Sequence, residues 1–242
     1  MEKPDFLAAL ARDGEAFAAA CEAADMSATV AACPGWSVAD LAWHINEVLA
    51  FWATIVGQQR DSWEGYERPA RSADDELVAA VRAQLAATLS ILGAVDPAQP
   101  NWTWAADHSA GFVIRRLAHE MAVHRRDAEQ AAGRDTVIDA ALASDGIDEF
   151  LTYFRGDVAE GALPVGGSVH LHCTDVAGEW TVRPLPAGSD AVVREHAKGD
   201  AAIRGAASDI LLVLWRRRPL NAVDVVGDPA VAERFVARPA LD

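Results

Sequence analysis

Residues 117–130 read LAHEMAVHRRDAEQ, and this segment indicates how the first half of the chain folds. Its apolar side chains recur at the spacing of a helix that packs against a core. Residues four apart on a helix differ by about 40° in direction, so Glu120 and His124 share a face, and Asp127 lies further along it. His119 is rotated away from His124 by about 140° and is expected to pack elsewhere.

Three more helices are predicted before this segment. Ser37 follows the Pro-Gly break in CPGW and is predicted to cap a helix, with Asp40 three residues on. Gly133 is a natural stop for the fourth helix. The predicted helices cover residues 4–25, 38–55, 74–92 and 112–132. Joined by polar loops, they predict a four-helix bundle over residues 1–136.

The pattern changes after Gly133, where a smaller α+β domain with an antiparallel sheet is predicted over residues 137–242. Strands are predicted at 168–174, 179–184, 191–196, 200–205 and 222–227, and helices at 139–154, 207–217 and 228–237. His170 and His172 share one face of the first strand. With no acidic or thiol partner evident nearby, that face is predicted to be exposed rather than to bind metal.

Charge and cysteine content limit the possible functions. The 242 residues include 21 Lys and Arg against 36 Asp and Glu, a net charge of −15. This balance argues against nucleic acid and anionic membranes as partners, because both attract a dense basic face. Three cysteines suggest no disulfide framework. The N-terminal segment lacks an apolar signal core, and no uninterrupted apolar run approaches membrane-spanning length, so a cytoplasmic protein is expected.

A metal site needs a third ligand, and His44 is the candidate. It lies on the second predicted helix among Leu41, Val48 and Phe51, at positions that should face the core. Two imidazoles and one carboxylate suit Zn²⁺ or another first-row divalent ion. Spacing alone leaves the alternative open, since such pairs are often surface contacts and His44 is then an ordinary core histidine.

Two segments carry a resemblance to a known family. Residues 33–44, CPGWSVADLAWH, and residues 119–129, HEMAVHRRDAE, are similar to the two hallmark segments of the mycothiol-dependent maleylpyruvate isomerase family. That family belongs to the DinB-like metal-binding bundles and carries a sterol-carrier-like α+β domain at its C-terminal end. The resemblance covers nearly the whole chain and implies this two-domain fold here.

The resemblance also implies roles for individual residues. The family's metal ligands fall on His44, Glu120 and His124. Arg126 stands where the family usually has Trp, which puts the substrate in doubt. Arg217, in LWRRRPL, matches an arginine of the family's L-W-G-R element that is thought to face the active site, although Arg216 replaces the glycine.

The implied activity is metal-dependent activation of mycothiol, a low-molecular-weight thiol, for isomerisation of a small electrophile or for transfer to it. A dication, zinc first, would deprotonate the thiol. Asp127 is expected to orient His124 or bind the thiol, and Arg217 to pair with a substrate carboxylate. The alternatives are a non-catalytic metal-containing protein that binds a ligand or partner, and a thiol-independent metal hydrolase.

Two other residues have expected roles outside this site. Cys33 is predicted to be structural, and His108 is predicted to be a solvated loop histidine.

Overall fold

The computed structural model describes residues 1–185 and 190–241, and the chain forms two compact units, with the boundary between Thr136 and Val137. Each unit has its own hydrophobic core. The division falls in the segment between the last bundle helix and the first helix of the α+β region.

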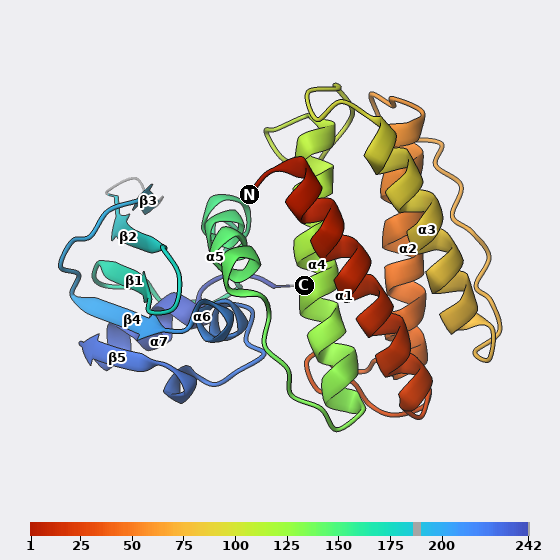
Figure 1. The fold of residues 1–242 in the computed structure, drawn as a ribbon. Coiled ribbons are helices and arrows are strands. Elements are labelled where there is room, and N and C mark those ends of the chain that lie inside the picture. The colour runs from red at the N-terminus through yellow and green to blue at the C-terminus, as the bar shows by residue number, and fades with distance from the viewer. Residues whose placement is uncertain (186–189, 242) are drawn as a thin grey trace. The chain divides into compact units, whose positions relative to one another are not determined.

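The first unit is a bundle of four long helices (Figure 1). They are α1 (Lys3–Ala23), α2 (Val38–Gly57), α3 (Leu77–Ala94) and α4 (Ala110–Ala131). α1 packs against α4 and α3, and α2 packs against α3 and α4. The predicted four-helix bundle is confirmed, and the predicted helix ends agree with the structure to within a few residues. Gly133 follows α4 with a φ of +74°, the left-handed conformation that ends helices.

A capping box fixes the start of α2. The Ser37 side chain accepts a hydrogen bond from the Asp40 backbone N–H at 3.2 Å, and the Asp40 carboxylate accepts one from the Ser37 N–H at 3.0 Å. Arg71, from the long loop before α3, donates to the same carboxylate at 2.8 Å. These bonds satisfy N–H groups that the first turn of a helix otherwise leaves unpaired. They also set the position of His44, seven residues along α2.

A buried ion pair holds α1 to α4. Arg125 of α4 lies 3.2 Å from the Asp13 carboxylate of α1 and donates to Glu129, one turn further along α4, at 2.7 Å. All three side chains are at least nine-tenths buried. A buried charge is costly unless it is paired, so this cluster fixes how α1 and α4 pack as well as stabilising the contact.

α3 is long and apolar enough to cross a membrane by length and composition alone, and 28% of its residues are buried. Arg82 and Gln84 interrupt its apolar sequence, and Arg82 binds Glu15 and Glu22 of α1, each at 3.0 Å. A single such helix is weak evidence for a membrane span. The predicted absence of a membrane partner therefore stays a prediction.

The second unit is an α+β fold around a five-stranded sheet in the described residues. Its helical elements are α5 (Ala140–Glu149), which continues as a π-helical turn η1 (Phe150–Phe154), α6 (Ala207–Leu214), the 3₁₀ turn η2 (Leu220–Ala222) and α7 (Pro229–Ala237). Its strands are β1 (Val169–Cys173), β2 (Glu179–Pro184), β3 (Asp190–Val193), β4 (Ala201–Gly205) and β5 (Asp224–Gly227). The strand order is β3-β2-β1-β4-β5.

The sheet differs from the prediction in one pairing. Three of the pairings are antiparallel, but β1 and β4 run parallel, so the sheet is mixed. The chain leaves β1 through the β2–β3 hairpin and returns to the other side of β1, and this crossover makes β4 parallel. Val169 and Leu171 of β1 are fully buried, and α6 and α7 contact β1 and β4.

The opposite face of β1 is not as predicted. His170 is 7% exposed, so the expectation that this face is simply solvated is wrong for its first histidine. The segment after β3 covers this part of the sheet, because the Thr181 hydroxyl beside His170 is buried and donates to the Glu195 carbonyl at 3.5 Å. Alternation within one strand does not reveal a segment that returns from elsewhere in the chain.

We expect Ser37→Ala to lower the free energy of unfolding by about 1 kcal/mol, because α2 loses its cap. Urea denaturation measures the change.

The Ser37 N–H, Arg71 and the Ser37 hydroxyl lower the pKa of Asp40 from 3.8 to about 2. The stability that Asp40 contributes is therefore present above pH 4 and is lost as the pH falls towards 2. The difference between wild type and Asp40→Asn should shrink over that interval, and a difference independent of pH would contradict the assignment.

Asp13→Ala should lower the free energy of unfolding by about 3–5 kcal/mol, because Arg125 stays buried with only part of its compensating charge. Glu22→Ala is the matched control, since that carboxylate pairs with Arg82 at the surface and its loss should cost about 1 kcal/mol or less. Equal losses in the two variants, measured by thermal or urea unfolding, would show that the buried pair has no special role.

Candidate metal centre

Three side chains from α2 and α4 converge on one point. The Nε2 atom of His44 lies 3.2 Å from Oε1 of Glu120, and Nε2 of His124 lies 3.3 Å from the same oxygen. The two imidazole rings stand nearly perpendicular, with centroids 5.1 Å apart. The predicted metal ligands, far apart in sequence, therefore meet in space. All three offer ligand atoms within 4.8 Å of one another.

Arg116 positions the Glu120 carboxylate. One helical turn earlier on α4, its guanidinium lies 2.7 Å from Oε2 of Glu120, which leaves Oε1 directed at the two imidazoles. Burial opposes ionisation of Glu120, but the charge of Arg116 and hydrogen bonds from His124 and His44 outweigh it and hold the pKa of Glu120 well below its ordinary value. The carboxylate is therefore charged and ready to bind a cation.

Asp127 positions His124 from the other side. Its buried carboxylate lies 3.0 Å from Nδ1 of His124. Burial alone would lower the pKa of His124, but hydrogen bonds with Asp127, Cys33 and Glu120 raise it well above the ordinary value. The raised pKa places protons on both ring nitrogens of the metal-free site, with the Nδ1 proton shared with Asp127 and the Nε2 proton directed at Glu120. A cation would displace the Nε2 proton and leave the Nδ1 proton with Asp127. A carboxylate that holds a histidine in this way is a common partner of metal-binding imidazoles.

The spacing of these donors fits a divalent cation. Atoms about 2.0–2.1 Å from one tetrahedral ion are about 3.3–3.4 Å apart. The distances from Glu120 Oε1 to the two imidazole nitrogens, 3.2 and 3.3 Å, are close to this value. Two nitrogens and one carboxylate oxygen suit Zn²⁺ and its neighbours in the first transition row, and three protein ligands leave one position for a further molecule.

A second donor set overlaps the first. Cys33 lies in the segment before α2, with its sulfur 3.9 Å from Oδ2 of Asp127, and Cys33, His124 and Asp127 also offer ligand atoms within 4.8 Å of one another. The sequence did not place Cys33 beside this site. We favour the set with His44 and Glu120, because Asp127 engages Nδ1 of His124 and leaves Nε2 directed at Glu120.

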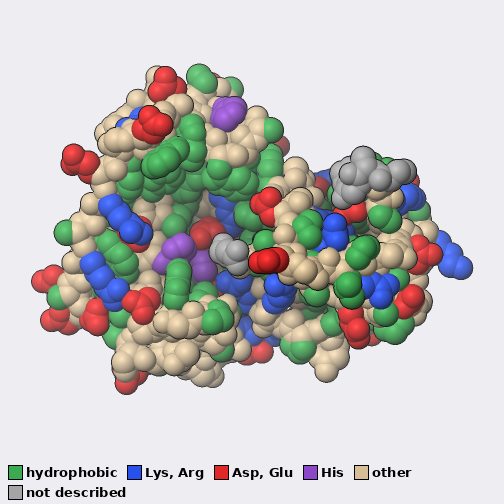
Figure 2. Space-filling model, turned by 180° about the vertical axis from the view of Figure 1, so that it is seen from behind, with side chains coloured by type: hydrophobic (Ala, Val, Ile, Leu, Met, Phe, Trp, Pro, Cys, Tyr) green, Lys and Arg blue, Asp and Glu red, His purple; other side chains and the backbone are tan. Residues whose placement is uncertain are grey.

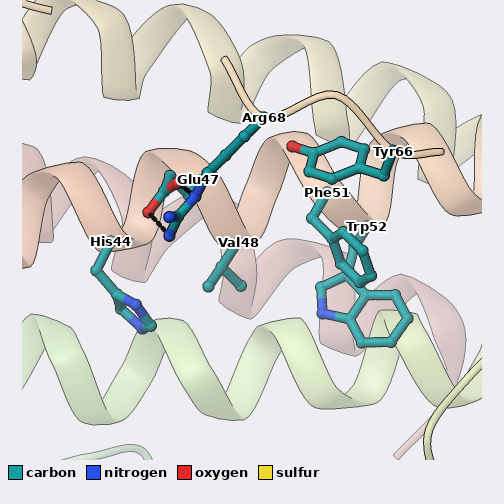
Figure 3. A pocket seen from close by; sticks show the side chains of 7 residues that line it. All are labelled: His44, Glu47, Val48, Phe51, Trp52, Tyr66 and Arg68. Atoms are coloured by element: carbon teal, nitrogen blue, oxygen red, sulfur yellow. Dashed lines mark hydrogen bonds and ion pairs between the residues drawn. The ribbon is translucent and has the colours of Figure 1, made fainter. Parts of the chain in front are cut away.

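A cavity of about 210 Å³ begins at His44 (Figure 3). Val48, Phe51 and Trp52, from the same face of α2, form its apolar wall. Its rim includes Tyr66 and an ion pair of Arg68 with Glu47, and Figure 3 shows this pair beside His44. On the surface of the helical unit, histidine side chains lie beside a large group of hydrophobic ones (Figure 2). A small, largely apolar molecule can therefore reach His44.

Other residues singled out in the sequence have defined places. Trp36, within the first hallmark segment, packs on His44 with ring centroids 4.9 Å apart, so it lines the candidate site. His119 is buried and packs edge-on against Phe6, as expected for a packing residue. Arg126, where the family usually has Trp, is buried and forms an ion pair with Asp135 at 2.7 Å. His108 is exposed.

In the second unit, Arg217 is half-buried and donates to the Trp215 carbonyl at 3.0 Å. Arg216, where the family element has glycine, has a φ of +57°. That left-handed conformation favours glycine, which supports aligning Arg217 with the family's arginine. Arg216 also donates to the carbonyls of Val236 and Ala237, so it is engaged at the end of α7.

Sequence reasoning missed Arg116, which holds the carboxylate of Glu120. The sequence did indicate this contact, because Arg116 precedes Glu120 by four residues and oppositely charged residues at this spacing share a helix face. The contact between Cys33 and Asp127 had no comparable signal, since it joins a loop to a distant helix.

Comparison with known families and structures identifies the family and the fold. Residues 7–129 match the family model described as the mycothiol maleylpyruvate isomerase N-terminal domain, and residues 141–234 match the MDMPI C-terminal domain. Among curated proteins, no relative matches the sequence.

Two crystal structures share the fold, a mycothiol-dependent maleylpyruvate isomerase and a histidine-to-alanine mutant of one. Each has a TM-score of 0.63 and covers 93% of both chains, with 10% and 11% sequence identity respectively.

We predict that Glu120→Gln lowers the affinity of this site for Zn²⁺ by more than about 100-fold, since ligand loss should exceed the about 10–100-fold effect of losing a residue that only supports a ligand. Cys33→Ser is the discriminating control and should bind Zn²⁺ as wild type does. Titration against a competing chelator measures both. Retained binding in Glu120→Gln together with loss in Cys33→Ser would move the site to the cysteine set.

Proposed function

Because the chain belongs to the mycothiol-dependent maleylpyruvate isomerase family, we propose that it is an enzyme that activates mycothiol at a divalent metal held by His44, Glu120 and His124. The observation that carries the proposal is the convergence of the two imidazoles on a single oxygen of Glu120. We propose zinc as the metal, a cytoplasmic location, and a small electrophile as the substrate.

The metal supplies the acidity that the thiol lacks, since a free thiol has a pKa near 8.5 and coordination to a dication lowers it. The chain's own residues supply position. Arg116 and Asp127 fix the direction of Glu120 and His124, so the ligands need little rearrangement before binding. Trp36 packs on the His44 ring and the apolar wall of the cavity lies beside it, so a substrate that fills the cavity would exclude water from this side of His44.

For an isomerase, the thiol sulfur adds to one carbon of a cis double bond, and the electron pair moves onto the substrate's conjugated carbonyl group. Rotation about the resulting single bond comes next, and departure of the sulfur restores the double bond in the trans form. The thiol is regenerated and no oxidant is required. For a transferase, a proton adds to the neighbouring carbon and the sulfur stays attached.

The substrate's carboxylate needs a cationic partner under this proposal. Arg217 is the residue that the family resemblance puts forward, and the planar fork of a guanidinium matches the two oxygens of a carboxylate. Arg68 at the cavity rim is already paired with Glu47. Arg126 in place of the family's Trp is the reason to test electrophiles other than maleylpyruvate.

We expect the zinc-loaded protein to isomerise maleylpyruvate, or to consume another electrophile, only when mycothiol is present. His44→Ala should lower kcat/KM by at least about 1000-fold through loss of a ligand, whereas the exposed His108→Ala should leave it unchanged. Absorbance of the substrate and free-thiol assays monitor the reaction. Turnover without thiol would favour the hypothesis of a thiol-independent metal hydrolase. No turnover with a panel of electrophiles would favour the hypothesis of a non-catalytic metal-containing protein.

Asp127→Asn tests the positioning role. An asparagine keeps the shape but weakens the hold on the His124 Nδ1 proton, so zinc affinity or kcat/KM should fall about 10–100-fold. Asp107→Asn, at an exposed loop position, is the matched control. Asp127→Glu should restore part of the zinc affinity if the charge matters. Equal zinc affinity in wild type, Asp127→Asn and Asp107→Asn would remove this role.

A further inference from the structure

A second cluster of potential metal ligands lies in the α+β unit. We propose that His170, His172, Glu179 and His196 form a separate binding site for a first-row divalent cation, with Zn²⁺ as the reference ion. The proposal does not depend on the centre between α2 and α4, because it uses none of its residues. The four side chains offer ligand atoms that all lie within 4.8 Å of one another.

Strand pairing creates the cluster. β1 pairs with β2 so that His172 lies opposite Glu179, while His170 lies on the same face two residues away. The Glu179 carboxylate is shared, with Oε1 2.7 Å from Nδ1 of His172 and Oε2 3.7 Å from Nε2 of His170. Register in the sheet therefore fixes three of the four donors.

The fourth donor comes from the segment after β3. His196 places its Nδ1 atom 2.7 Å from Oε2 of Glu179, and its ring centroid lies 5.1 Å from that of His170. The same segment lies close against β1, because a Cβ on Gly199 would be only 2.9 Å from the His170 backbone nitrogen. A bound cation would fasten this segment to the sheet.

His170 is the observation that points to a ligand. Its side chain is 9% exposed, and its Nε2 atom makes no hydrogen bond within 3.5 Å among the described residues, since the Glu179 carboxylate lies 3.7 Å away. A buried polar atom that lacks a hydrogen-bond partner destabilises the folded state. That atom faces the other members of the cluster, where coordination to a cation would satisfy it.

The donor set also selects the class of ion. Three imidazoles and one carboxylate give four donors, the number that closes a tetrahedral zinc site. Ca²⁺ and Mg²⁺ prefer oxygen ligands, so a site with three nitrogens disfavours them.

The site has a route for the ion. A hollow of about 570 Å³ is lined by His170, His196, Lys198 and Asp200, together with residues of β4 and β5. The His196 side chain is 76% exposed, so one donor can move to admit the ion while the other three stay in place. Binding is then expected to order the segment around His196.

The test measures zinc stoichiometry in untagged protein. In the His44→Ala/Glu120→Gln background, which lacks two ligands of the other centre, we expect one zinc per chain after dialysis, measured by mass spectrometry of metals. Adding His172→Ala and His196→Ala should remove it, whereas adding His108→Ala should not. Circular dichroism confirms that each variant is folded, and the exposed His196→Gln alone should weaken zinc binding at least about 10-fold.

Co²⁺ gives a second readout, because its visible absorption reports four-coordinate nitrogen and oxygen ligands. Zinc retained after both substitutions, or no zinc in the background protein, would overturn the proposal. If wild type binds one zinc that His44→Ala leaves in place and His172→Ala removes, the second site stands and the proposed function fails. If wild type instead binds one zinc that His172→Ala leaves in place and His44→Ala removes, the proposed function stands and this site fails.

Discussion

One oxygen atom, Oε1 of Glu120, is the point on which the helical unit's chemistry depends. His44 from α2 and His124 from α4 both direct Nε2 at it, from 3.2 and 3.3 Å. Neither helix alone holds the three donors, so the site exists only when the bundle is packed. Packing of the two helices also depends on the site, because a charged carboxylate at the contact between two helices is tolerated only with compensating partners.

α4 carries several contacts between charged groups, one of which compensates Glu120. Arg116 binds the far oxygen of Glu120, Asp127 binds His124, and Arg125 pairs with Asp13 of α1. These contacts recur along one helix at three- and four-residue spacing or cross to a neighbouring helix. The helix that supplies two of the proposed ligands therefore also carries the ion pairs that fix its position, which joins the geometry of the site to the stability of the bundle.

Features governed by local rules were predictable from the sequence. Helical spacing located α4 and paired Glu120 with His124, and the Ser37 capping box placed the start of α2. Helical spacing also put His44 forward as the third residue, and the resemblance of the hallmark segments supported that choice. Pairings between distant segments were not predictable, because alternation fixes a strand's faces but not its neighbours. For that reason the parallel β1–β4 pair and the closeness of His196 to Glu179 became visible only in the structure.

The most direct measurement is a crystal structure of the zinc-loaded protein with anomalous diffraction recorded at the zinc absorption edge. The account predicts a peak about 2.0–2.1 Å from Nε2 of His44, Nε2 of His124 and an oxygen of Glu120. A peak bound instead by Cys33 and Asp127, or imidazoles of His44 and His124 that turn away from Glu120 with no peak between them, would contradict it.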